Sequence, residues 1–404
     1  MTEAEDSMKI VEPEQVGFST ERLARINPVM QGYIDREQFA GVITLIARKG
    51  QLIHLQKFGS QSREEHRPME LDTIFRIYSM TKPITSTAVM MLCEEGKVRL
   101  VDPVSRYIPA FKNTKVMTSR NGCDYELVPA RREMTVHDLF THTAGLSYGF
   151  DSQSSLDDMY RKEIWGRIEE NPQITLEELI QVLAGLPLAF HPGEAFRYSM
   201  SIDVLGYIVQ VASGKPFDVF LKERIFDPLG MPDTEFTVPP EKISRLSTVY
   251  GPAESGGLKP IDQPASSRYA HPTRNPSGGG GLVSTVSDYF RFGQMLLNQG
   301  ELEGVRLLGR KTVEWMLQNH LPDGITANGN PALGFGLGGS VLLKPGLLHQ
   351  PGSVGRFGWG GAANTEWWID PQEQLLCLFM TQYMPGFTIP IVEDFGQLTY
   401  QALL

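Results

Sequence analysis

The chain has 404 residues, of which 41% are hydrophobic, 21% charged and 9% aromatic. This balance is typical of a globular protein and excludes disorder, collagen and coiled coil as descriptions of the whole chain. The formal net charge is −10 and no strongly basic stretch offsets it, so we expect no nucleic-acid partner.

Three cysteines, Cys93, Cys123 and Cys377, are widely spaced and form no C-x-x-C pair. Their odd number and their spacing favour free thiols in a reducing compartment. Residues 1–15 are acidic where a signal peptide would be basic and then apolar. No run approaches the roughly 18 apolar residues of a membrane span. We therefore expect a cytoplasmic protein with no membrane partner.

Both ends of the chain carry strand patterns next to amphipathic helices. In chain order, the predicted elements are a helix at 19–35 with Ser19 as its N-cap, a hairpin at 41–47 and 51–55, a second hairpin at 365–369 and 375–381, and a helix at 391–404. Each hairpin has turn residues between its two β-rich runs, which is why these segments predict paired strands.

Between these ends the hydrophobic periodicity is helical. The predicted helices lie at 84–95, 135–142, 175–185, 201–213, 217–226, 286–299 and 310–319. Segments rich in proline, glycine and serine connect them. The conformation of the irregular segments within 105–175 and 240–280 does not follow from the sequence.

The simplest architecture pairs the two terminal hairpins in one antiparallel sheet. We therefore predict an α+β fold, in which an antiparallel sheet built from N- and C-terminal strands is flanked by helices. Residues 1–78 and 340–404 would form this sheet domain, and residues 79–339 a large, mostly helical inserted domain. We expect the active site at the interface between the two.

Two glycine-rich segments resemble phosphate-binding loops but lack what those loops need. Residues 334–339 contain a formal G-x-G-x-x-G, yet position 359 is Trp where a dinucleotide fingerprint has an acidic residue. Residues 277–281 lack the Gly-Lys-Ser/Thr of a phosphate loop. We interpret the first segment as the flexible start of a strand and the second as a turn that allows close approach of the backbone.

The segment 145–149 (GLSYG) matches the G-x-S-x-G nucleophile elbow of α/β-hydrolases. That elbow needs a strand before the serine and a helix after it, whereas residues 135–142 look helical and a loop follows the motif. The histidine of an elbow should lie late in the chain, where only His320 and His349 remain. We treat the motif as a decoy and keep Ser147 as the alternative nucleophile.

The segment 79–82 (SMTK) is an S-x-x-K motif, which is unspecific alone but is placed here at the start of a helix. Pro83 suits a first helical turn, and an apolar stripe follows that ends at Gly96 as C-cap. Ser79 therefore opens a buried helix, and Lys82, one turn on, shares its face. The helix N-terminus supplies N–H donors and positive potential where an oxyanion would form.

This placement has a chemical rationale. A serine hydroxyl needs a base to become a nucleophile, and the amine of Lys82 can serve if it is neutral. A tyrosine at hydrogen-bonding distance would complete a proton relay. The alternative is that Lys82 extends from a core helix to solvent and has no catalytic role.

Several segments together resemble the serine β-lactamase and penicillin-binding-protein superfamily. The resemblance is closer to the family VIII carboxylesterases, which share that fold, and it covers nearly the whole chain. Its anchors follow the order of the family and are 79–82 (SMTK), 139–146 (LFTHTAGL), 191–199 (HPGEAFRYS), 277–287 (SGGGGLVSTVS) and 359–361 (WGG). Each anchor alone is weak evidence for the family, but the occurrence of all five in the order of the family makes the resemblance specific.

The resemblance implies a role for each matching residue. Ser79 would be the acylated nucleophile, and Lys82 and Tyr198 would share the general base and acid work. The oxyanion hole would consist of the backbone N–H groups of Ser79 and of Ala362, just after the Trp-Gly-Gly strand. The residues expected to contact the substrate are Met200, Trp359, Gly360 and Gly361.

Two departures from the lactamase pattern guide the choice of activity. Where β-lactamases and peptidases show Tyr-x-Asn, this chain has Met200, which cannot donate amide hydrogen bonds to a peptide-like substrate. Where they show Lys/His-Thr-Gly, this chain has Trp359, an apolar wall in place of the groups that hold a substrate carboxylate. These departures favour neutral esters over penicillins and cell-wall peptides.

We therefore predict a serine carboxylesterase that hydrolyses short- to medium-chain acyl esters through an acyl-enzyme on Ser79. The alternatives are an acyltransferase, a β-lactamase or DD-peptidase type hydrolase on the same site, and a non-catalytic binding protein on the same fold. The histidines show no metal-ligand spacing, so we expect no metal and no cofactor, and we interpret His142 as a structural loop anchor. The expected partner is a small-molecule ester. A homo-oligomer is compatible with the sequence, which leaves the oligomeric state open.

Overall fold

The computed structural model of the chain describes residues 9–120 and 124–404. Cys123 and the first eight residues, which entered the expectations on compartment, lie outside these ranges. Within them, Cys93 and Cys377 are free thiols. No helix in the described part of the chain has the length and apolar character to cross a lipid bilayer.

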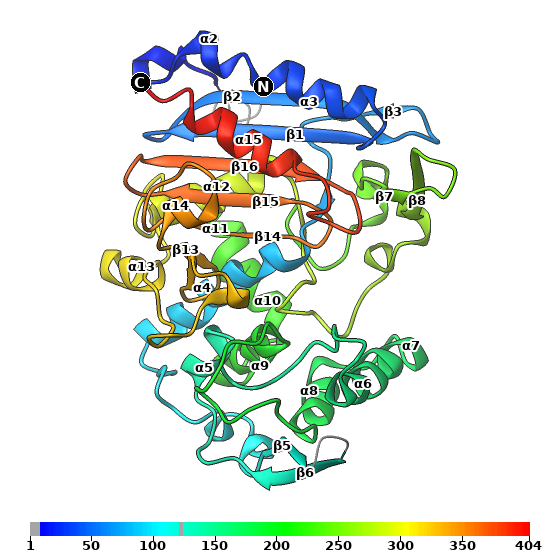
Figure 1. Cartoon of the computed structure of the whole chain (residues 1–404), viewed down its shortest axis with the longest axis vertical. Helices are drawn as coiled ribbons and strands as arrows, with labels where there is room; N and C mark the ends of the chain where they lie inside the picture. The colour runs from blue at the N-terminus through cyan, green and yellow to red at the C-terminus, as the bar shows by residue number, and fades with distance from the viewer. Residues whose placement is uncertain (1–8, 121–123) are drawn as a thin grey trace.

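An eight-stranded antiparallel sheet joins the two ends of the chain (Figure 1). Its strands, in spatial order, are β12 (Leu333–Phe335), β13 (Ser340–Leu342), β14 (Phe357–Gly360), β15 (Glu366–Asp370), β16 (Leu375–Thr381), β1 (Gly41–Arg48), β2 (Gln51–Ser62) and β3 (Arg67–Pro68). Strand β1 pairs with β16, and Leu45 lies opposite Leu378. The predicted pairing of the terminal hairpins in one sheet is therefore confirmed.

Helices from both termini cover one face of the sheet (Figure 1): α2 (Thr20–Leu23), α3 (Ile26–Asp35) and α15 (Ile391–Tyr400). The single helix predicted at 19–35 is thus divided in two. Ser19 does cap the first piece, because its hydroxyl accepts the backbone N–H of Arg22 at 3.3 Å. Pro28 has no N–H to donate to the carbonyl of Ala24, so the chain breaks there and Pro28 falls in the first turn of α3.

The other face of the sheet packs against α12 (Val286–Leu297) and, beneath it, α4 (Thr81–Glu94). Helix α4 is buried on all sides, because every residue from Thr81 to Leu92 is buried. The predicted apolar stripe describes only one of its faces. Buried hydroxyls on the other faces bond carbonyl groups, as when Thr85 Oγ1 donates to the Gly278 carbonyl at 2.8 Å.

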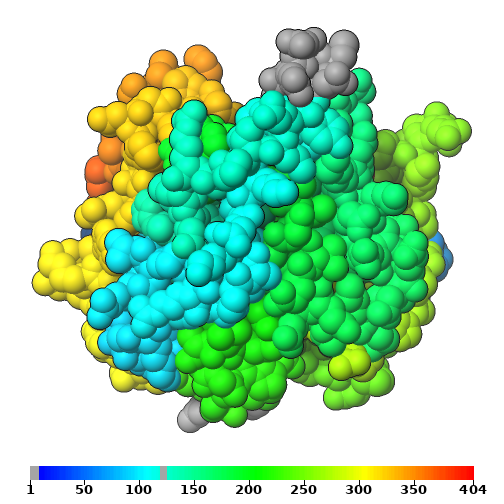
Figure 2. All heavy atoms as spheres, turned by 90° about the horizontal axis from the view of Figure 1, so that it is seen from below, coloured from blue at the N-terminus to red at the C-terminus, as the bar shows by residue number. Residues whose placement is uncertain are grey.

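The middle of the chain forms the half of the molecule farther from the terminal helices (Figures 1 and 2). Its helices are α5 (Val136–Phe140), α6 (Ser155–Tyr160), α7 (Arg167–Glu170), α8 (Leu176–Ala184), α9 (Ser201–Ser213), α10 (Phe217–Leu221), α11 (Asp227–Leu229) and α13 (Arg310–Met316). The short helix α14 (Pro345–Leu348) lies beside the main sheet, between β13 and β14 in the chain (Figure 1). Every helix predicted in the middle of the chain has a counterpart in this set or in α4 and α12. The view from below shows this face built from the cyan, green and yellow parts of the chain (Figure 2).

Four short strand pairs lie outside the main sheet, and none of them was predicted. They are β4 (Phe75–Arg76) with β9 (Val283–Ser284), β5 (Lys115–Arg120) with β6 (Asp124–Pro129), β7 (Val249–Pro252) with β8 (Leu258–Asp262), and β10 (Glu301–Leu302) with β11 (Val305–Arg306). The pair β4 and β9 matters most for the site, because β4 leads directly into the turn that carries Ser79.

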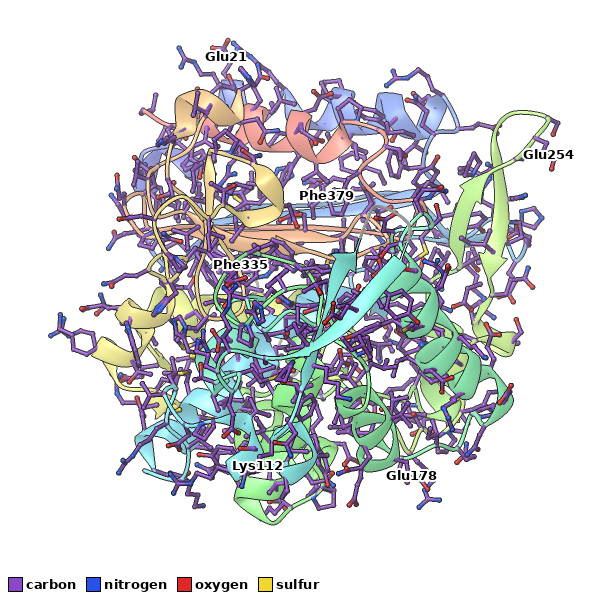
Figure 3. All side chains as sticks on the ribbon, turned by 60° about the horizontal axis from the view of Figure 1, so that its bottom comes forward. Glu21, Lys112, Glu178, Glu254, Phe335 and Phe379 are labelled. Carbon is purple, nitrogen blue, oxygen red and sulfur yellow. The ribbon has the colours of Figure 1, made fainter. Side chains whose placement is uncertain are left out.

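The domain boundary predicted at residue 340 falls inside the sheet, since β12 (Leu333–Phe335) already belongs to it. Phe335 and Phe379 in Figure 3 lie at different depths below the terminal helices, and Phe335 packs against Trp359 near the site. The glycines of 334–339 form the β12–β13 hairpin, in which Phe335 pairs with Ser340. This agrees with our interpretation of that motif as the start of a strand.

Candidate active site

Ser79 lies in a single 3₁₀ turn, η2 (Tyr78–Met80), which runs directly into α4. The residue before it, Tyr78, has a φ of +42°, a left-handed conformation that is uncommon for a bulky side chain. The turn is held from the sheet side by the end of β14 (Phe357–Gly360), since a Cβ at Gly361 would lie 2.5 Å from the Ile77 carbonyl. Only glycine permits this approach, which fixes the position of the Ser79 backbone.

Two side chains donate hydrogen bonds to the Ser79 hydroxyl. Lys82 Nζ lies 3.1 Å from Ser79 Oγ, and the Tyr198 hydroxyl lies 2.7 Å from it. Lys82 is completely buried, so the alternative in which it extends to solvent is wrong. The predicted trio of Ser79, Lys82 and Tyr198 is therefore brought together, although Tyr198 lies 119 residues away in the chain.

The Lys82 ammonium is held by a carbonyl and two aromatic rings. It donates to the Gly279 carbonyl at 2.6 Å, and it lies 4.5 Å from the ring centre of Tyr198 and 5.3 Å from that of Tyr148. Cations over aromatic faces are stabilised, more so when desolvated. The glycine segment 277–281 thus acts as the expected turn for close backbone approach, and its function is to present a carbonyl to Lys82.

Asp203 supports this arrangement and was missed from the sequence. Its buried carboxylate accepts hydrogen bonds from the Gly279 N–H at 3.1 Å and from the Ser277 hydroxyl, so it positions the carbonyl that Lys82 contacts. A Cβ at Gly279 would lie 2.4 Å from Asp203 Oδ2. Asp203 stands in the first turn of α9, where an acidic residue ordinarily indicates only a favourable interaction with the helix dipole.

Trp359 contacts Tyr198 through its polar edge as well as its ring. The indole N–H donates to the Tyr198 oxygen at 3.1 Å, and the two ring centres lie 5.4 Å apart. The sequence predicted an apolar wall at Trp359. The structure adds a hydrogen-bond donor, which stabilises negative charge on the Tyr198 oxygen.

His142 packs against the other side of Tyr198, at 4.8 Å between ring centres. Burial, and to a smaller extent the positive charge of Lys82, hold the pKa of His142 well below its usual value. Its Nδ1 accepts the backbone N–H of Ser199 at 3.2 Å. The neutral imidazole therefore anchors the segment that carries Tyr198, which fits our interpretation of His142 as a structural residue.

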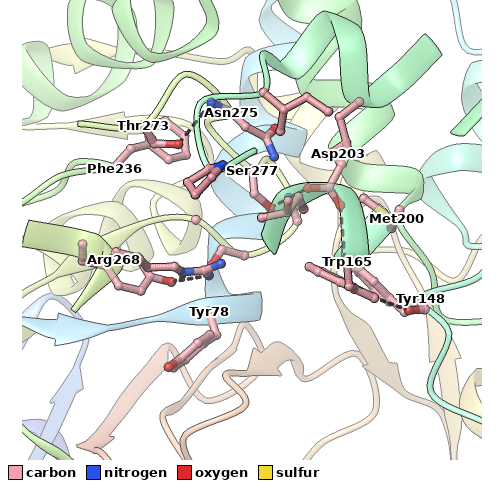
Figure 4. Close-up of a pocket in the computed structure, with 18 of the residues that line it drawn as sticks. Tyr78, Tyr148, Trp165, Met200, Asp203, Phe236, Arg268, Thr273, Asn275 and Ser277 are labelled. Carbon is pink, nitrogen blue, oxygen red and sulfur yellow. Dashed lines mark hydrogen bonds between the residues drawn. The ribbon is translucent and has the colours of Figure 1, made fainter. Parts of the chain in front are cut away.

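Two cavities meet at Ser79, and both walls include Ser79, Tyr198, Ala362 and Phe150. We name the first the helix-side cavity; it holds about 370 Å³ and is lined mainly from 148–179, 198–203 and 268–281 (Figure 4). We name the second the sheet-side cavity; it holds about 550 Å³ and is lined mainly from 328–360 and 387–396. Two connected spaces around one hydroxyl suit a substrate with two halves.

The predicted substrate contacts divide between the two cavities. Met200 lines the helix-side cavity, and Trp359 and Gly360 line the sheet-side cavity. Ala362 lies where both cavities open, one residue beyond the contact of Gly361 with the Ser79 turn. Among the described residues, no hydrogen-bond acceptor takes the Ala362 N–H, so it is free to meet a substrate oxygen.

Ser147 has a different environment. It is 2% exposed, and its hydroxyl donates to Asp157 Oδ1 at 2.7 Å while it accepts the Gly149 N–H and the Arg197 guanidinium. Helix α5 and a loop at 141–146 lead into Ser147, where an elbow would have a strand. The residues around Ser147 therefore do not form a nucleophile elbow. Within the described ranges, no group of three or more His, Cys, Asp or Glu side chains is arranged to hold a metal ion.

Comparisons with known proteins agree with the fold and with the sequence anchors. A family model described as Beta-lactamase matches residues 26–393. The protein Rv1367c of Mycobacterium tuberculosis is 35% identical over 364 residues, covering 88% of each chain, and the esterase EstB of Burkholderia gladioli is 30% identical over 376 residues, covering 89% of this chain and 90% of EstB.

Among solved structures, EstCE1, described as a hydrolase with promiscuous acyltransferase activity, superimposes with a TM-score of 0.81. It is 28% identical and the match covers 94% of this chain and 99% of EstCE1. These matches extend over nearly the whole length of both partners, so they concern the complete fold and not one motif. The chain therefore belongs to the Beta-lactamase family of serine hydrolases, and within it to the family VIII esterases that its sequence resembles.

Proposed function

We propose that the protein is a serine carboxylesterase that hydrolyses short- to medium-chain acyl esters through an acyl-enzyme on Ser79. One observation carries the proposal: Ser79 Oγ lies 3.1 Å from Lys82 Nζ and 2.7 Å from the Tyr198 hydroxyl, where two cavities meet. The esterase name of EstB and the hydrolase description of EstCE1 support the same reaction class.

In the acylation step, Tyr198 and Lys82 share the proton of Ser79. Acylation needs the Ser79–Tyr198 hydrogen bond in the reverse direction, with Tyr198 as a phenolate next to Lys82 and the Trp359 N–H. The Tyr198 oxygen then takes the Ser79 proton as Oγ attacks the ester carbonyl carbon. The tetrahedral intermediate then collapses and breaks the bond to the alcohol oxygen. Tyr198 returns the proton to that departing oxygen, and the acyl group stays on Ser79.

In the deacylation step, water takes the place of the alcohol. The Tyr198 oxygen accepts a proton from the water as it attacks the acyl carbon, and the bond to Ser79 Oγ breaks. The proton then passes to Ser79, which restores the free enzyme and releases the carboxylic acid. The same groups therefore serve both half-reactions, as a ping-pong mechanism requires.

The backbone N–H groups of Ser79 and Ala362 would hold the oxyanion of each tetrahedral intermediate. Ser79 lies at the start of α4, so the positive end of that helix adds to the stabilisation. Gly361 lets the strand end approach the nucleophile turn, which places the next N–H, that of Ala362, at the mouth of both cavities.

The lining of the helix-side cavity favours an apolar acyl group of limited length. Its lining includes the apolar side chains of Trp165, Ile168, Leu179 and Met200, of which Figure 4 labels Trp165 and Met200. Methionine and aromatic side chains gain from burying an acyl chain and offer no amide hydrogen bonds to a peptide. The cavity volume of about 370 Å³ gives room for an acyl chain of short or medium length.

Covalent labelling tests the proposal directly. We expect a fluorophosphonate to add once to the protein, as seen by intact mass, and peptide mapping to find the label on Ser79. Ser79→Ala should take up no label, whereas Ser147→Ala, the matched control, should be labelled at the wild-type rate. Label on Ser147 would instead support an α/β-hydrolase type of mechanism, and no label together with no ester hydrolysis would favour a binding protein.

Acyl transfer to an alcohol is the second candidate, favoured by the sheet-side cavity, in which an acceptor alcohol could replace water. The description of EstCE1 as a hydrolase with promiscuous acyltransferase activity points the same way. Hydrolysis and acyl transfer are distinguished by their products. We would measure the amounts of free acid and of transferred ester while the concentration of an acceptor alcohol is increased. If transfer dominates at low millimolar acceptor, the protein is better described as an acyltransferase.

A further inference from the structure

The two cavities that meet at Ser79 are lined by different chemistry. The helix-side cavity is lined by apolar and aromatic side chains and by two charged ones, Asp203 and Arg268, whose charged groups already hydrogen-bond within the protein. The sheet-side cavity carries three charged side chains, Arg356, Glu366 and Glu393. An ester has an acyl half and an alcohol half, so each cavity receives one of them.

The proton relay indicates which cavity receives the alcohol. In the proposed function, on which this inference rests, the departing alkoxide takes its proton from the Tyr198 oxygen. That oxygen is held by the indole N–H of Trp359 at 3.1 Å, and Trp359 belongs to the wall of the sheet-side cavity. An alcohol on the sheet side therefore departs beside the Tyr198 oxygen that Trp359 holds, while the acyl chain lies in the helix-side cavity. Tyr198 borders both cavities, so the lining of the sheet-side cavity carries the rest of this assignment.

The polar groups of the sheet-side cavity lack partners inside the protein. In the described part of the chain, the side chains of Arg356, Glu366 and Glu393 make no hydrogen bond and no ion pair, and Glu393 Oε2 is buried without a partner. The indole N–H of Trp368, a residue only 5% exposed, also has none. Arg356 lies over the Trp368 ring at 5.8 Å. Two of these polar atoms, Glu393 Oε2 and the Trp368 indole nitrogen, are buried without a partner, which is costly, and the half-buried Arg356 and Glu366 lie beside them in the same cavity wall. Their collection around one cavity indicates a ligand site.

Glycines in β14 (Phe357–Gly360) make room for these groups. A Cβ at Gly360 would lie 2.3 Å from Glu366 Oε2 and 2.5 Å from the ring of Phe387, so only glycine lets that carboxylate lie across the strand. A Cβ at Gly358 would lie 2.8 Å from that of Trp368. The backbone of β14 therefore forms the floor of the cavity, and the side chains of Glu366 and Trp368 lie beside it.

We propose that the sheet-side cavity binds the alcohol half of the substrate, and that this alcohol is a neutral polyol whose neighbouring hydroxyls are held by Arg356, Glu366 and Glu393. Glycerol and sugars share this chemistry. The inference names the substrate class of the proposed esterase site: an apolar short- to medium-chain acyl group esterified to a polyhydroxylated alcohol.

Hydroxyl groups match this lining because each can both donate and accept. They donate to a carboxylate and accept from a guanidinium or from the Trp368 N–H. The lining holds one basic and two acidic side chains, so it offers no single sign of charge to a charged alcohol. Burial raises the pKa of Glu366 to about 8, so its carboxyl can donate to a hydroxyl as well as accept from one near neutral pH. A plain alkyl alcohol would leave all these groups unpaired.

Two butyrate esters with the same acyl group test the inference. Glyceryl 1-monobutyrate and propyl butyrate differ only by two hydroxyl groups on the alcohol, and both give the same acyl-enzyme. We expect kcat/KM for the glyceryl ester to exceed that for the propyl ester by about tenfold or more, after correction for alkaline hydrolysis rates. A third substrate, 6-O-butyryl glucose, shows whether kcat/KM is higher for a sugar or for glycerol as the alcohol.

Variants separate binding of the hydroxyls from chemistry. In Arg356→Met, which keeps the apolar contact with Trp368, and in Glu393→Gln, we expect the ratio of kcat/KM for the hydroxylated ester over the propyl ester to fall about tenfold. Arg310→Met, which removes an exposed guanidinium from α13, is the matched control and should leave the ratio unchanged. Thermal unfolding checks that each variant is folded.

The outcomes are distinguishable. A ratio near one in the wild type, or a ratio that neither variant lowers, overturns the assignment of the sheet-side cavity while ester hydrolysis stands. A preference for cationic choline butyrate or for an anionic ester over glyceryl butyrate also overturns it. Absence of hydrolysis of every ester, with no label on Ser79, would remove the proposed function itself.

Discussion

Ser79 and Ser147 both lie in networks of polar side chains, but only one of them faces open space. Ser79 is half-buried, its partners are an amine and a phenol, and two cavities open beside it. Ser147 is 2% exposed, and its partner Asp157 forms an ion pair with Arg197 at 2.7 Å. A reactive serine needs space for a substrate and a partner that can exchange its proton. Ser147 instead completes the hydrogen bonds of a buried ion pair, so its expected role is structural.

We expect the largest effect on activity from the substitution of Ser79. Ser79→Ala removes the nucleophile while adding no bulk, so kcat for ester hydrolysis should fall by about 10⁴-fold or more. The midpoint of thermal unfolding should change little, because Ser79 is half-buried and its hydroxyl donates to no buried acceptor within the described ranges. Steady-state kinetics on a butyrate ester, with circular dichroism as a folding check, measures both. A variant that kept a tenth of the activity would remove Ser79 from the mechanism.

Tyr198→Phe keeps the ring that packs on His142 and Trp359 but removes the oxygen that Ser79 contacts. We expect kcat to fall by about 10² to 10⁴-fold, the usual range for loss of a general acid or base. Stability should remain close to that of the wild type. Rates near those of the wild type would show that Lys82 alone exchanges the proton.

Trp359→Phe tests the indole N–H separately from the aromatic wall. Without the 3.1 Å hydrogen bond to the Tyr198 oxygen, negative charge there is less stabilised, and we expect kcat to fall by about tenfold. The effect should be on kcat more than on KM, because the N–H acts on the proton relay and the ring remains. An equal rise in KM with unchanged kcat would mean that Trp359 acts only as a substrate wall.

Ser147→Ala should reverse the pattern, with kcat within about threefold of the wild type and stability lowered by about 1 to 3 kcal/mol, because Arg197 and Asp157 lose a buried partner. Burial alone would raise the pKa of Asp157, but hydrogen bonds from Ser147, the Asp151 N–H and Arg197 outweigh it and hold that pKa below its usual value.

The acid dependence of stability follows from this shift. A carboxyl with a lowered pKa stabilises the folded state above its unfolded-state pKa of about 3.9, and the contribution is lost as the pH falls through the folded-state value. The stability gap between wild type and Ser147→Ala should therefore be full at pH 7 and shrink below about pH 4. A gap that is constant from pH 7 to pH 3 would show that Asp157 does not depend on Ser147.

The parts of the fold that the sequence predicted have strong local signals. The two terminal hairpins carry turn residues between β-rich runs, and helix 201–213 agrees with α9 (Ser201–Ser213). The helical region from Ser155 to Glu170 was missed because a π-helical segment, Arg161–Gly166, interrupts its 3.6-residue periodicity. The hairpin β5–β6, whose first strand also forms a parallel bridge with Leu188, was missed because its strands alternate weakly.

The same division holds within the site. The spacing of Ser79 and Lys82 and their place at a helix start could be predicted, because both depend on one turn of backbone. The support from Asp203 could not, because an acidic residue in a first helical turn has an ordinary explanation. Nor could the sheet-side cavity be predicted, because its charged residues come from the loop before β14 (Arg356), from β15 (Glu366) and from α15 (Glu393).

By itself, then, the sequence determined that a serine and a lysine share one face at the start of a buried helix, and that the hairpins at the two ends have the pattern of paired strands. The tertiary structure decided that Lys82 is buried, that Tyr198 lies 2.7 Å from a serine 119 residues away, and that Trp359 holds the tyrosine oxygen. The physical reason is the separation along the chain over which each kind of interaction acts. Periodicity and capping record contacts within a few residues, whereas hydrogen bonds across the chain depend on how helices and strands pack, which no local pattern specifies.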